Sequence, residues 1–349
     1  MNKVNPKGGR LLVNHQIEDF TMYFIGNDVS KKTLDLACFD QQRNRWSRPC
    51  KLDNNPKGWD ALIQWAEKQT RASREDICIV MEATGVYHLK VAAYLSLEGL
   101  NVIVVNPQQA SQYAKSQNQQ NKSDKLDARS LQEYGAQLKK YHLFIPDSPE
   151  INQLKALLSR MRQLDKDLQR ERNRLEKCDF QEGSSWARTS IKRLIGHITS
   201  EQKLTQQQID QLINQNHELK QNQKLLHSIK GIGKLTSQWL LPLLSTQRFN
   251  NAREVAAFLG LVPCHKSSGT SLKTRGRLSG RGDADLRARL YMPAVCAITH
   301  DPAMKAFYQQ LVAKGKPSKV ALTAVMRKLV HVCYGVIKHQ TPYIENYAA

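Results

Sequence analysis

Four carboxylates occupy positions from which they could converge on a metal ion. Asp28 follows a short apolar run at residues 23–25, and Glu82 follows a continuous apolar run at residues 77–81. Asp124 and Asp127 are three residues apart, so an expected helix would present both on one face. Converging carboxylates repel one another unless a cation joins them, and Mg²⁺ or Mn²⁺ prefers oxygen ligands. Two such ions stabilise the entering and leaving oxygens of a phosphodiester, so this set predicts metal-dependent phosphodiester chemistry.

The alternative interpretation is that each acid is a helix cap or a solvated residue. It is strong for Asp124 taken alone and weaker for Glu82, because an acid that ends a buried strand has little packing reason to be there. Lys122, Lys125 and Arg129 surround the two aspartates, and their expected role is phosphate contact near the metal. For any one of these cations, a solvated helix face remains the alternative.

A second candidate site is the polar loop at residues 263–282. Ser267 and Ser268 lie beside Gly269, and a serine hydroxyl flanked by guanidinium groups could attack a phosphate. The cations of this loop are Lys266, Lys273, Arg275, Arg277 and Arg281. From composition alone, a loop that only binds phosphate is the simpler interpretation.

A glycine turn precedes that loop. Gly231 and Gly233, next to Lys230, separate two expected helices in the manner of a helix–hairpin–helix. Backbone amides at such a helix N-terminus can hold a DNA phosphate. An ordinary turn between helices is the alternative, since glycine turns are common.

The apolar pattern places the four acids in an α/β domain at residues 22–147. Residues 22–52 predict an antiparallel meander, and the runs at 77–81 and 102–105 predict strands separated by a helix. RNase-H-like folds use this order, in which the first and fourth strands are neighbours. Residues 1–21 are expected to be a flexible leader.

Two helical parts are expected after this domain. Apolar residues recur at three- and four-residue steps within residues 148–224, which predicts two coiled-coil arms at about 151–175 and 191–226. Residues 225–345 predict a mainly α-helical domain that carries the serine loop.

The charge balance indicates a polyanionic partner. Lys and Arg number 52 against 31 Asp and Glu, a formal net charge of +21, so nucleic acid is the expected partner. The seven cysteines include no CxxC pair, which argues against a disulfide framework or structural zinc and favours a reducing cytoplasm. No run reaches about 18 consecutive apolar residues, so no membrane partner is expected.

These motifs resemble the DEDD transposases of bacterial insertion sequences, which include bridge-RNA-guided recombinases and related pilin-gene invertases. The N-terminal segments that carry the resemblance are GNDVSK at 26–31, MEATG at 81–85 and NKSDKLDAR at 121–129. The C-terminal segments are residues 229–234, 257–263, 268–271 and 290–294. Together they follow the family's order from about residue 22 to residue 343.

The resemblance implies a RuvC-like domain in which Asp28, Glu82, Asp124 and Asp127 bind Mg²⁺ or Mn²⁺. It implies that Ser268 is a nucleophile that becomes covalently linked to a cleaved strand. It also implies a homodimer or homotetramer that acts on donor and target double-stranded DNA, with a noncoding guide RNA, in the bacterial cytoplasm at the nucleoid. Asn27 stands where many relatives have a small apolar residue, and the choice of Ser268 over Ser267 depends on aligning Gly269.

Three functions therefore compete. A DNA recombinase requires the four acids and the serine. A RuvC-like structure-specific endonuclease requires the acids but forms no covalent intermediate. A non-catalytic nucleic-acid-binding protein requires neither, and acids in all four positions argue against it.

Overall fold

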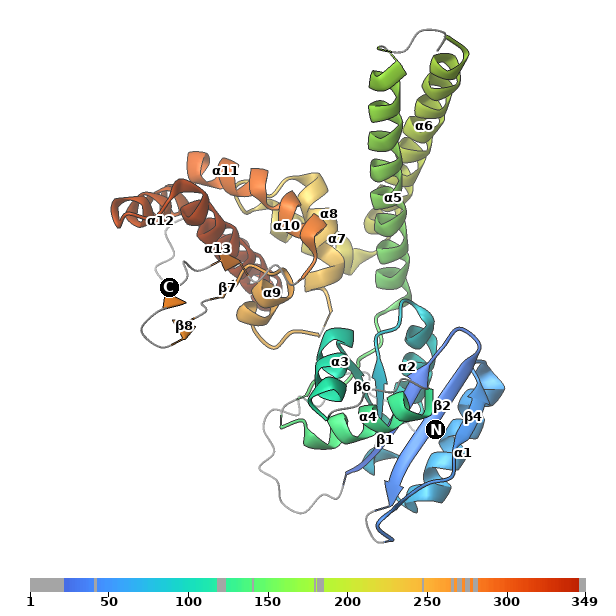
Figure 1. The fold of residues 1–349 in the computed structure, drawn as a ribbon. Coiled ribbons are helices and arrows are strands. Elements are labelled where there is room, and N and C mark those ends of the chain that lie inside the picture. The colour runs from blue at the N-terminus through green and yellow to red at the C-terminus, as the bar shows by residue number, and fades with distance from the viewer. Residues whose placement is uncertain are drawn as a thin grey trace, which may run out of the picture. The chain divides into compact units, whose positions relative to one another are not determined.

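The structure is a computed structural model that divides into two compact units, Met1–Pro146 and Asp147–Ala349. It describes residues 22–40, 43–117, 124–139, 141–178, 180, 185–246, 248–264, 267–268, 272–273, 277–278 and 282–344. The expected leader at residues 1–21 lies outside the described residues. Each unit is described below by itself (Figure 1).

The first unit is built on a six-stranded mixed sheet. Its strands run in the order β3-β2-β1-β5-β6, and β4 also pairs with β2. β1 pairs antiparallel with β2 but parallel with β5, and β5 pairs parallel with β6. The strands are β1 (Tyr23–Val29), β2 (Thr33–Asp40), β3 (Arg45–Trp46), β4 (Cys50–Asp53), β5 (Ile77–Glu82) and β6 (Asn101–Val105). The predicted meander followed by parallel strands is confirmed, and with it the RNase-H-like α/β fold.

Helices cover both faces of this sheet. α1 (Pro56–Thr70) and α2 (Tyr87–Leu97) pack on the face that carries Ile25 and Met81. α4 (Asp124–Gln137) packs on the opposite face against Phe24 and Val80. The unit also contains the 3₁₀ turn η1 (Arg74–Asp76) and α3 (Pro107–Ser116). Both faces of β5 are covered, which explains its uninterrupted apolar sequence.

Asn27 is a polar residue in the apolar layer between the sheet and α1 and α2. Its side chain is fully buried, and neither its amide nitrogen nor its carbonyl oxygen has a hydrogen-bond partner in the described part of the chain. Successive strand residues point to opposite faces, so Asn27 points away from the face that Asp28 shares with α4. A buried amide without partners destabilises the fold.

We therefore expect Asn27→Leu to raise the free energy of unfolding by about 1–2 kcal/mol, because leucine has a similar size and removes the unpaired polar atoms. Urea denaturation followed by circular dichroism measures this change. Asn27→Ala is the matched comparison and should gain less, since it leaves a cavity. A lower stability for Asn27→Leu would show that the amide has a partner in solution.

Long helices open the second unit. α5 (Pro149–Cys178) and α6 (Ser185–Gln215) lie side by side as an arm (Figure 1). Leu164, Leu168 and Ile198 form a small core along the arm, and Leu168 and Ile198 belong to the predicted apolar stripes. The second expected arm helix does not continue to residue 226. Asn216 ends it, because its side chain accepts a hydrogen bond from the Leu219 N–H and starts α7 (His217–His227).

The rest of the second unit is mainly α-helical, as predicted. Its helices are α8 (Lys234–Leu244), α9 (Ala252–Phe258), α10 (Ala284–Arg289), α11 (Tyr291–His300), α12 (Pro302–Ala313) and α13 (Ser318–His339). They share one large core with the base of the arm, where Ile151, Leu154 and Ile209 are buried. The predicted boundary at residues 224/225 thus falls within one continuous core and stays a prediction.

Among the helices in the described ranges, α13 alone is long and apolar enough to cross a membrane by length and composition. Counting consecutive apolar residues misses it, because basic residues interrupt the sequence. Val325, Leu329 and Cys333 of α13 are fully buried in the helical core. α13 therefore packs as the core helix of this unit.

Candidate active-site residues

Asp28 and Glu82 lie at the ends of two neighbouring parallel strands, Asp28 one residue before the end of β1 and Glu82 at the end of β5. The register pairs Asn27 of β1 with Met81 of β5, so Asp28 and Glu82 each follow the last paired position. Gly26 and Val80, two residues earlier on each strand, lie on the face that α4 covers. Because side chains alternate along a strand, both acids point to that same face. Both are partly exposed.

α4 approaches β1 so closely that only glycine fits at the crossing. A Cβ added to Gly26 would lie 1.8 Å from the carbonyl oxygen of Ala128. Further along α4, a Cβ on Gly135 would lie 2.4 Å from Cγ2 of Val80 and 3.3 Å from the ring of Phe24. α4 therefore runs from the Asp28 end of β1 towards its beginning.

This direction brings the N-terminal end of α4 to the end of the sheet that carries Asp28 and Glu82. Asp127 directly precedes Ala128, and its side chain is partly exposed there. Asp124 is the first residue of α4, one turn earlier, and its side chain lies outside the described atoms.

The donor set is chemically suited to a hard cation, since carboxylate oxygens are the usual ligands of Mg²⁺ and Mn²⁺. Among the side chains that the structure describes, no three His, Cys, Asp or Glu residues are grouped closely enough to hold a metal ion. Asp124 could not be included in this group, because its side chain lies outside the described atoms. Metal binding by the four acids therefore remains a proposal.

Asp35 is an acid near this site that the sequence interpretation missed. It pairs directly with Asp28 across β1 and β2, so the two side chains share a face of the sheet. Lys51 of β4 forms an ion pair with Asp35 at 3.2 Å. Lys51 therefore offsets the charge of Asp35 at this edge of the sheet. The alternation of polar and apolar residues in β2 could have placed Asp35 on the same face of the sheet as Asp28.

The cations expected around α4 have different placements. The Arg129 guanidinium lies 4.8 Å from the ring centroid of Trp46 and stacks on β3. This cation–π contact gives Arg129 a structural role, and phosphate contact stays a prediction. Lys122 lies outside the described residues, as does the side chain of Lys125.

The expected serine loop contains short strand pairs. β7 (Pro263–Cys264) pairs with β10 (Arg277–Leu278), and β8 (Ser267–Ser268) pairs with β9 (Leu272–Lys273). The side chains of Ser268, Lys273 and Arg277 are not among the described atoms, and Lys266, Arg275 and Arg281 lie outside the described residues. Within the described backbone, Ser268 opposes Leu272 and belongs to an extended segment.

Comparison with known proteins decides the family. A family described as "Transposase", of the DEDD type, matches residues 25–178, and the "Transposase IS116/IS110/IS902 family" matches residues 223–309. The pilin gene-inverting protein of Moraxella lacunata is 34% identical over 322 residues, which cover 92% of this chain and 97% of that protein. The chain belongs to the IS110 family of transposases. It is an enzyme that acts on DNA, and the predicted DEDD resemblance is confirmed.

Two further similarities are more limited in extent. An IS110 insertion-element protein of Streptomyces coelicolor is 30% identical over 120 residues, 34% of this chain and 29% of that protein. A solved structure titled "T. thermophilus RuvC in complex with Holliday junction substrate" matches 35% of the transposase and 99% of that chain. That match has 13% identity and a TM-score of 0.27. The RNase-H-like assignment accordingly relies on the strand order and register of this transposase itself.

The segments that precede and follow the transposase's serine loop contact each other. Gly282 has a φ of +111°, and a Cβ there would lie 2.2 Å from the carbonyl oxygen of Phe258. Arg287 of α10 donates a hydrogen bond to the Leu259 carbonyl oxygen at 3.0 Å. α9, which precedes the loop, is therefore tied to α10, which follows it.

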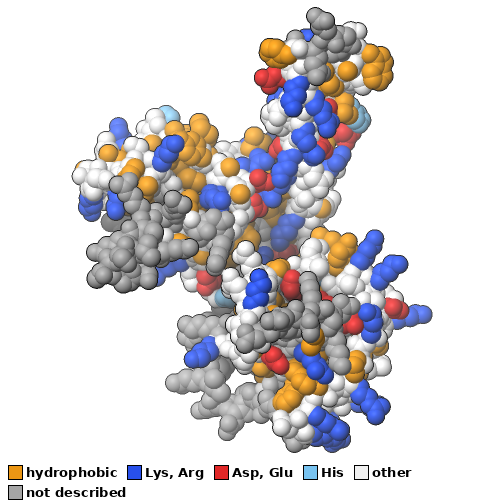
Figure 2. All heavy atoms as spheres, in the orientation of Figure 1, with side chains coloured by type: hydrophobic (Ala, Val, Ile, Leu, Met, Phe, Trp, Pro, Cys, Tyr) orange, Lys and Arg blue, Asp and Glu red, His pale blue; other side chains and the backbone are white. Residues whose placement is uncertain are grey.

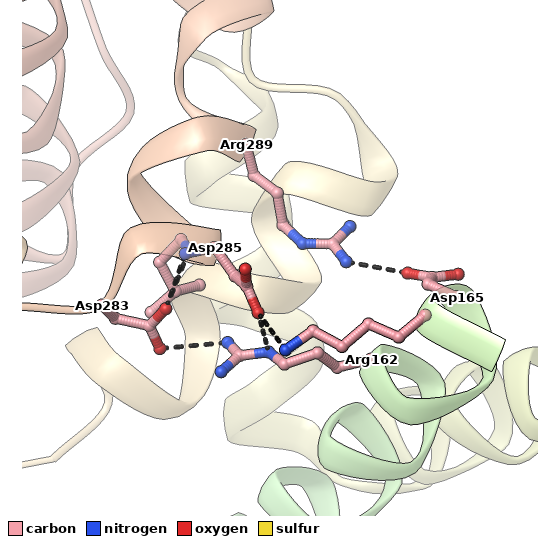
Figure 3. A network of polar contacts seen from close by, with 7 residues as sticks. Arg162, Asp165, Asp283, Asp285 and Arg289 are labelled. Carbon is pink, nitrogen blue, oxygen red and sulfur yellow. Dashed lines mark hydrogen bonds and ion pairs between the residues drawn. The ribbon is translucent and has the colours of Figure 1, made fainter. Parts of the chain in front are cut away.

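Ion pairs fix α10 to the arm (Figure 3). Arg162 of α5 contacts Asp283 at 3.0 Å and Asp285 at 3.2 Å, and Lys166 contacts Asp285 at 3.5 Å. Burial raises the pKa of Asp283, but the Leu286 N–H and the Arg162 guanidinium outweigh it and hold that pKa below its usual range. Asp283 therefore stays ionised at neutral pH and loses this pair only as the pH falls through the lowered pKa.

An aromatic ring completes this contact. The guanidinium carbons of Arg289 and Arg162 lie 4.0 Å and 5.3 Å from the ring centroid of Trp239 in α8. Arg289 also contacts Asp165 of α5 at 2.9 Å. The base of the arm, α8 and α10 thus form one polar cluster next to the end of the serine loop.

The glycine turn has a packing explanation. Gly231 has a φ of +93°, and a Cβ there would lie 2.4 Å from the carbonyl oxygen of Pro293 in α11. Gly233 caps α8 without such a neighbour, and Lys230 is exposed. Close approach of α11 therefore explains the glycine at position 231, and phosphate binding by Lys230, Gly231 and Gly233 stays a prediction.

Proposed function

We propose that this transposase is a DNA recombinase that cuts and rejoins strands with metal-binding carboxylates and a serine nucleophile. The observation that supports the proposal is the placement of Asp28, Glu82 and the Asp127 end of α4 at one end of the sheet. Asp28, Glu82, Asp124 and Asp127 would hold Mg²⁺ or Mn²⁺. When bound, such ions stabilise charge on the entering and leaving oxygens of a phosphodiester.

Ser268 is proposed as the nucleophile. Its Oγ forms a bond to the scissile phosphorus and releases its proton as one strand oxygen leaves as a hydroxyl. The phosphoserine ester conserves the broken phosphodiester, so rejoining to a partner strand requires no high-energy cofactor. Arginines of the loop would stabilise the charge that develops on the phosphate.

The proposed partners follow from charge and from the relatives. Lys and Arg side chains are spread over both units and along the arm (Figure 2). The matched Moraxella protein is named for inverting a pilin gene, which supports double-stranded DNA as donor and target. A noncoding guide RNA, a homodimer or homotetramer joined by the arms, and a cytoplasmic, nucleoid-associated location are further parts of the proposal.

The test is capture of a covalent protein–DNA adduct. Purified protein is incubated with Mg²⁺, its candidate flanking RNA and end-labelled donor DNA, and the products are separated before and after protease digestion. We expect a protease-sensitive adduct that Ser268→Ala abolishes and Ser267→Ala retains. An adduct lost only in Ser267→Ala would move the nucleophile by one residue. Metal-dependent cleavage without an adduct in any variant would favour the RuvC-like endonuclease instead.

A further inference from the structure

A row of polar and basic side chains, the basic seam, lies between α9 and α13, away from the residues assigned above. Arg327, His331, Tyr334 and Lys338 follow four-, three- and four-residue steps, so they share one side of α13. This side faces α9 and the residues before it, because the Tyr334 hydroxyl donates to the Phe249 carbonyl oxygen at 3.1 Å. The Lys338 ammonium similarly donates to the Asn250 carbonyl oxygen at 3.4 Å.

Arg253 of α9 lies on the same seam. α9 packs against α13, and the charges of Arg253 and Arg327 both act on His331 and lower its pKa. Among the residues that the structure describes, neither arginine forms an ion pair with a carboxylate. Glu254, the acid next to Arg253, instead accepts hydrogen bonds from the Asn250 N–H and the Asn251 side chain, both at 2.9 Å.

His331 carries an unused polar atom at this point. Its Nε2 is buried and has no hydrogen-bond partner in the described part of the chain. Burial lowers the pKa of His331, and the charges of Arg327 and Arg253 lower it further. Because neither arginine is engaged by a carboxylate in the described part of the chain, both guanidinium groups can bind phosphate oxygens without first breaking an ion pair.

We infer that Arg253, Arg327 and His331 form a binding site for the phosphodiester backbone of a nucleic acid. Lys338 extends this basic seam along α13. From Arg327 to Lys338 a helix rises about 16 Å, which is long enough to meet several phosphates of a duplex. A backbone contact of this kind positions the nucleic acid without selecting its sequence.

The site adds a binding surface to the proposed recombinase and uses none of its proposed catalytic residues. α9 leads directly into the serine loop, and Arg248 stacks on Phe258 at the end of α9, 5.2 Å from the ring centroid. A backbone bound along α9 and α13 would therefore reach the start of that loop.

The test is the salt dependence of binding by the full-length protein in EDTA, where no metal-dependent cleavage occurs. Kd is measured at several salt concentrations for a labelled DNA duplex of arbitrary sequence and, separately, for a labelled RNA. We expect Arg253→Gln/Arg327→Gln to weaken duplex binding about tenfold or more at low salt. The slope of log Kd against log salt should fall by about 0.9 for each lost phosphate contact.

Matched variants separate this contact from a change in net charge. Arg43 and Arg74 are already paired with acids, Arg74 with Glu67 at 2.7 Å, so Arg43→Gln/Arg74→Gln removes the same charge and should leave the slope unchanged. Arg253→Lys/Arg327→Lys should restore most of the slope, because lysine also binds phosphate. If the double variant unfolds, Arg253→Gln alone serves instead, because Arg253 is exposed. We expect this single variant to lower the slope by about half as much.

A slope in Arg253→Gln that falls no more than in the control pair would overturn the inference. An effect on RNA alone would assign the site to RNA, and an effect on duplex alone would assign it to DNA. The outcome is independent of Ser268, since binding in EDTA requires no covalent step. If Ser268→Ala abolishes the adduct but Arg253→Gln/Arg327→Gln leaves the salt slope unchanged, only the binding site on α9 and α13 is rejected.

Discussion

Replacing Asp28 with asparagine is expected to lower Mg²⁺-dependent cleavage of donor DNA by at least about 10³-fold. The side chain keeps its shape but loses the charge that would bind the cation next to Glu82. Asp28 lies near the end of β1 on the face that α4 covers, and the N-terminal end of α4 brings Asp127 to the same end of the sheet. Initial rates of strand cleavage on end-labelled DNA, measured over a range of Mg²⁺ concentrations, give the size of the effect.

Asp35→Asn is the control for this experiment. Asp35 pairs directly with Asp28 across the sheet and shares its face, but Lys51 already neutralises it. The control should keep cleavage within about threefold of the unmodified protein, since Asp35 is not one of the proposed metal ligands and keeps its shape as asparagine. Equal losses of cleavage rate in Asp28→Asn and Asp35→Asn would mean that any negative charge at this edge of the sheet supports cleavage. Full activity in Asp28→Asn would remove Asp28 from the metal site.

Replacing Gly26 with alanine is expected to destabilise the first unit by about 3 kcal/mol or more. The added Cβ would lie 1.8 Å from the Ala128 carbonyl oxygen and 2.7 Å from the Gln132 nitrogen, both backbone atoms of α4. α4 must then move away from β1, which also displaces Asp127 from Asp28. Both the free energy of unfolding and Mg²⁺-dependent cleavage should fall, whereas Asp28→Asn should affect cleavage alone.

Urea denaturation measures the loss, and hydrogen–deuterium exchange locates it in peptides from β1 and α4. Gly196→Ala in α6 is the matched substitution, because its Cβ would meet no atom within 4 Å. Alanine should stabilise that helix by up to about 1 kcal/mol. A stability within 0.5 kcal/mol of the unmodified protein for Gly26→Ala would show that α4 does not pack as closely as described, with that margin being about the usual effect of a surface change.

Local pattern predicted the elements of this protein because burial imposes periodicity on a chain. The uninterrupted apolar run before Glu82 predicted a central strand, and β5 is covered on both faces. The apolar stripe predicted the arm helices, and Leu164 and Leu168 are buried along them. The break at Asn216 was missed, because it depends on one capping hydrogen bond rather than on the hydrophobic pattern.

The sequence by itself determined the family and predicted the strand order and the four candidate acids, since these are carried by residue types and their spacing. Only the tertiary structure decided which side chains share a surface. The direction of α4 follows from the contacts at Gly26 and Gly135, and the pairing of Asp28 with Asp35 follows from strand register. The basic seam on α13 likewise requires α9 to lie beside it. Contacts between residues far apart in the chain arise from packing, which local periodicity does not record.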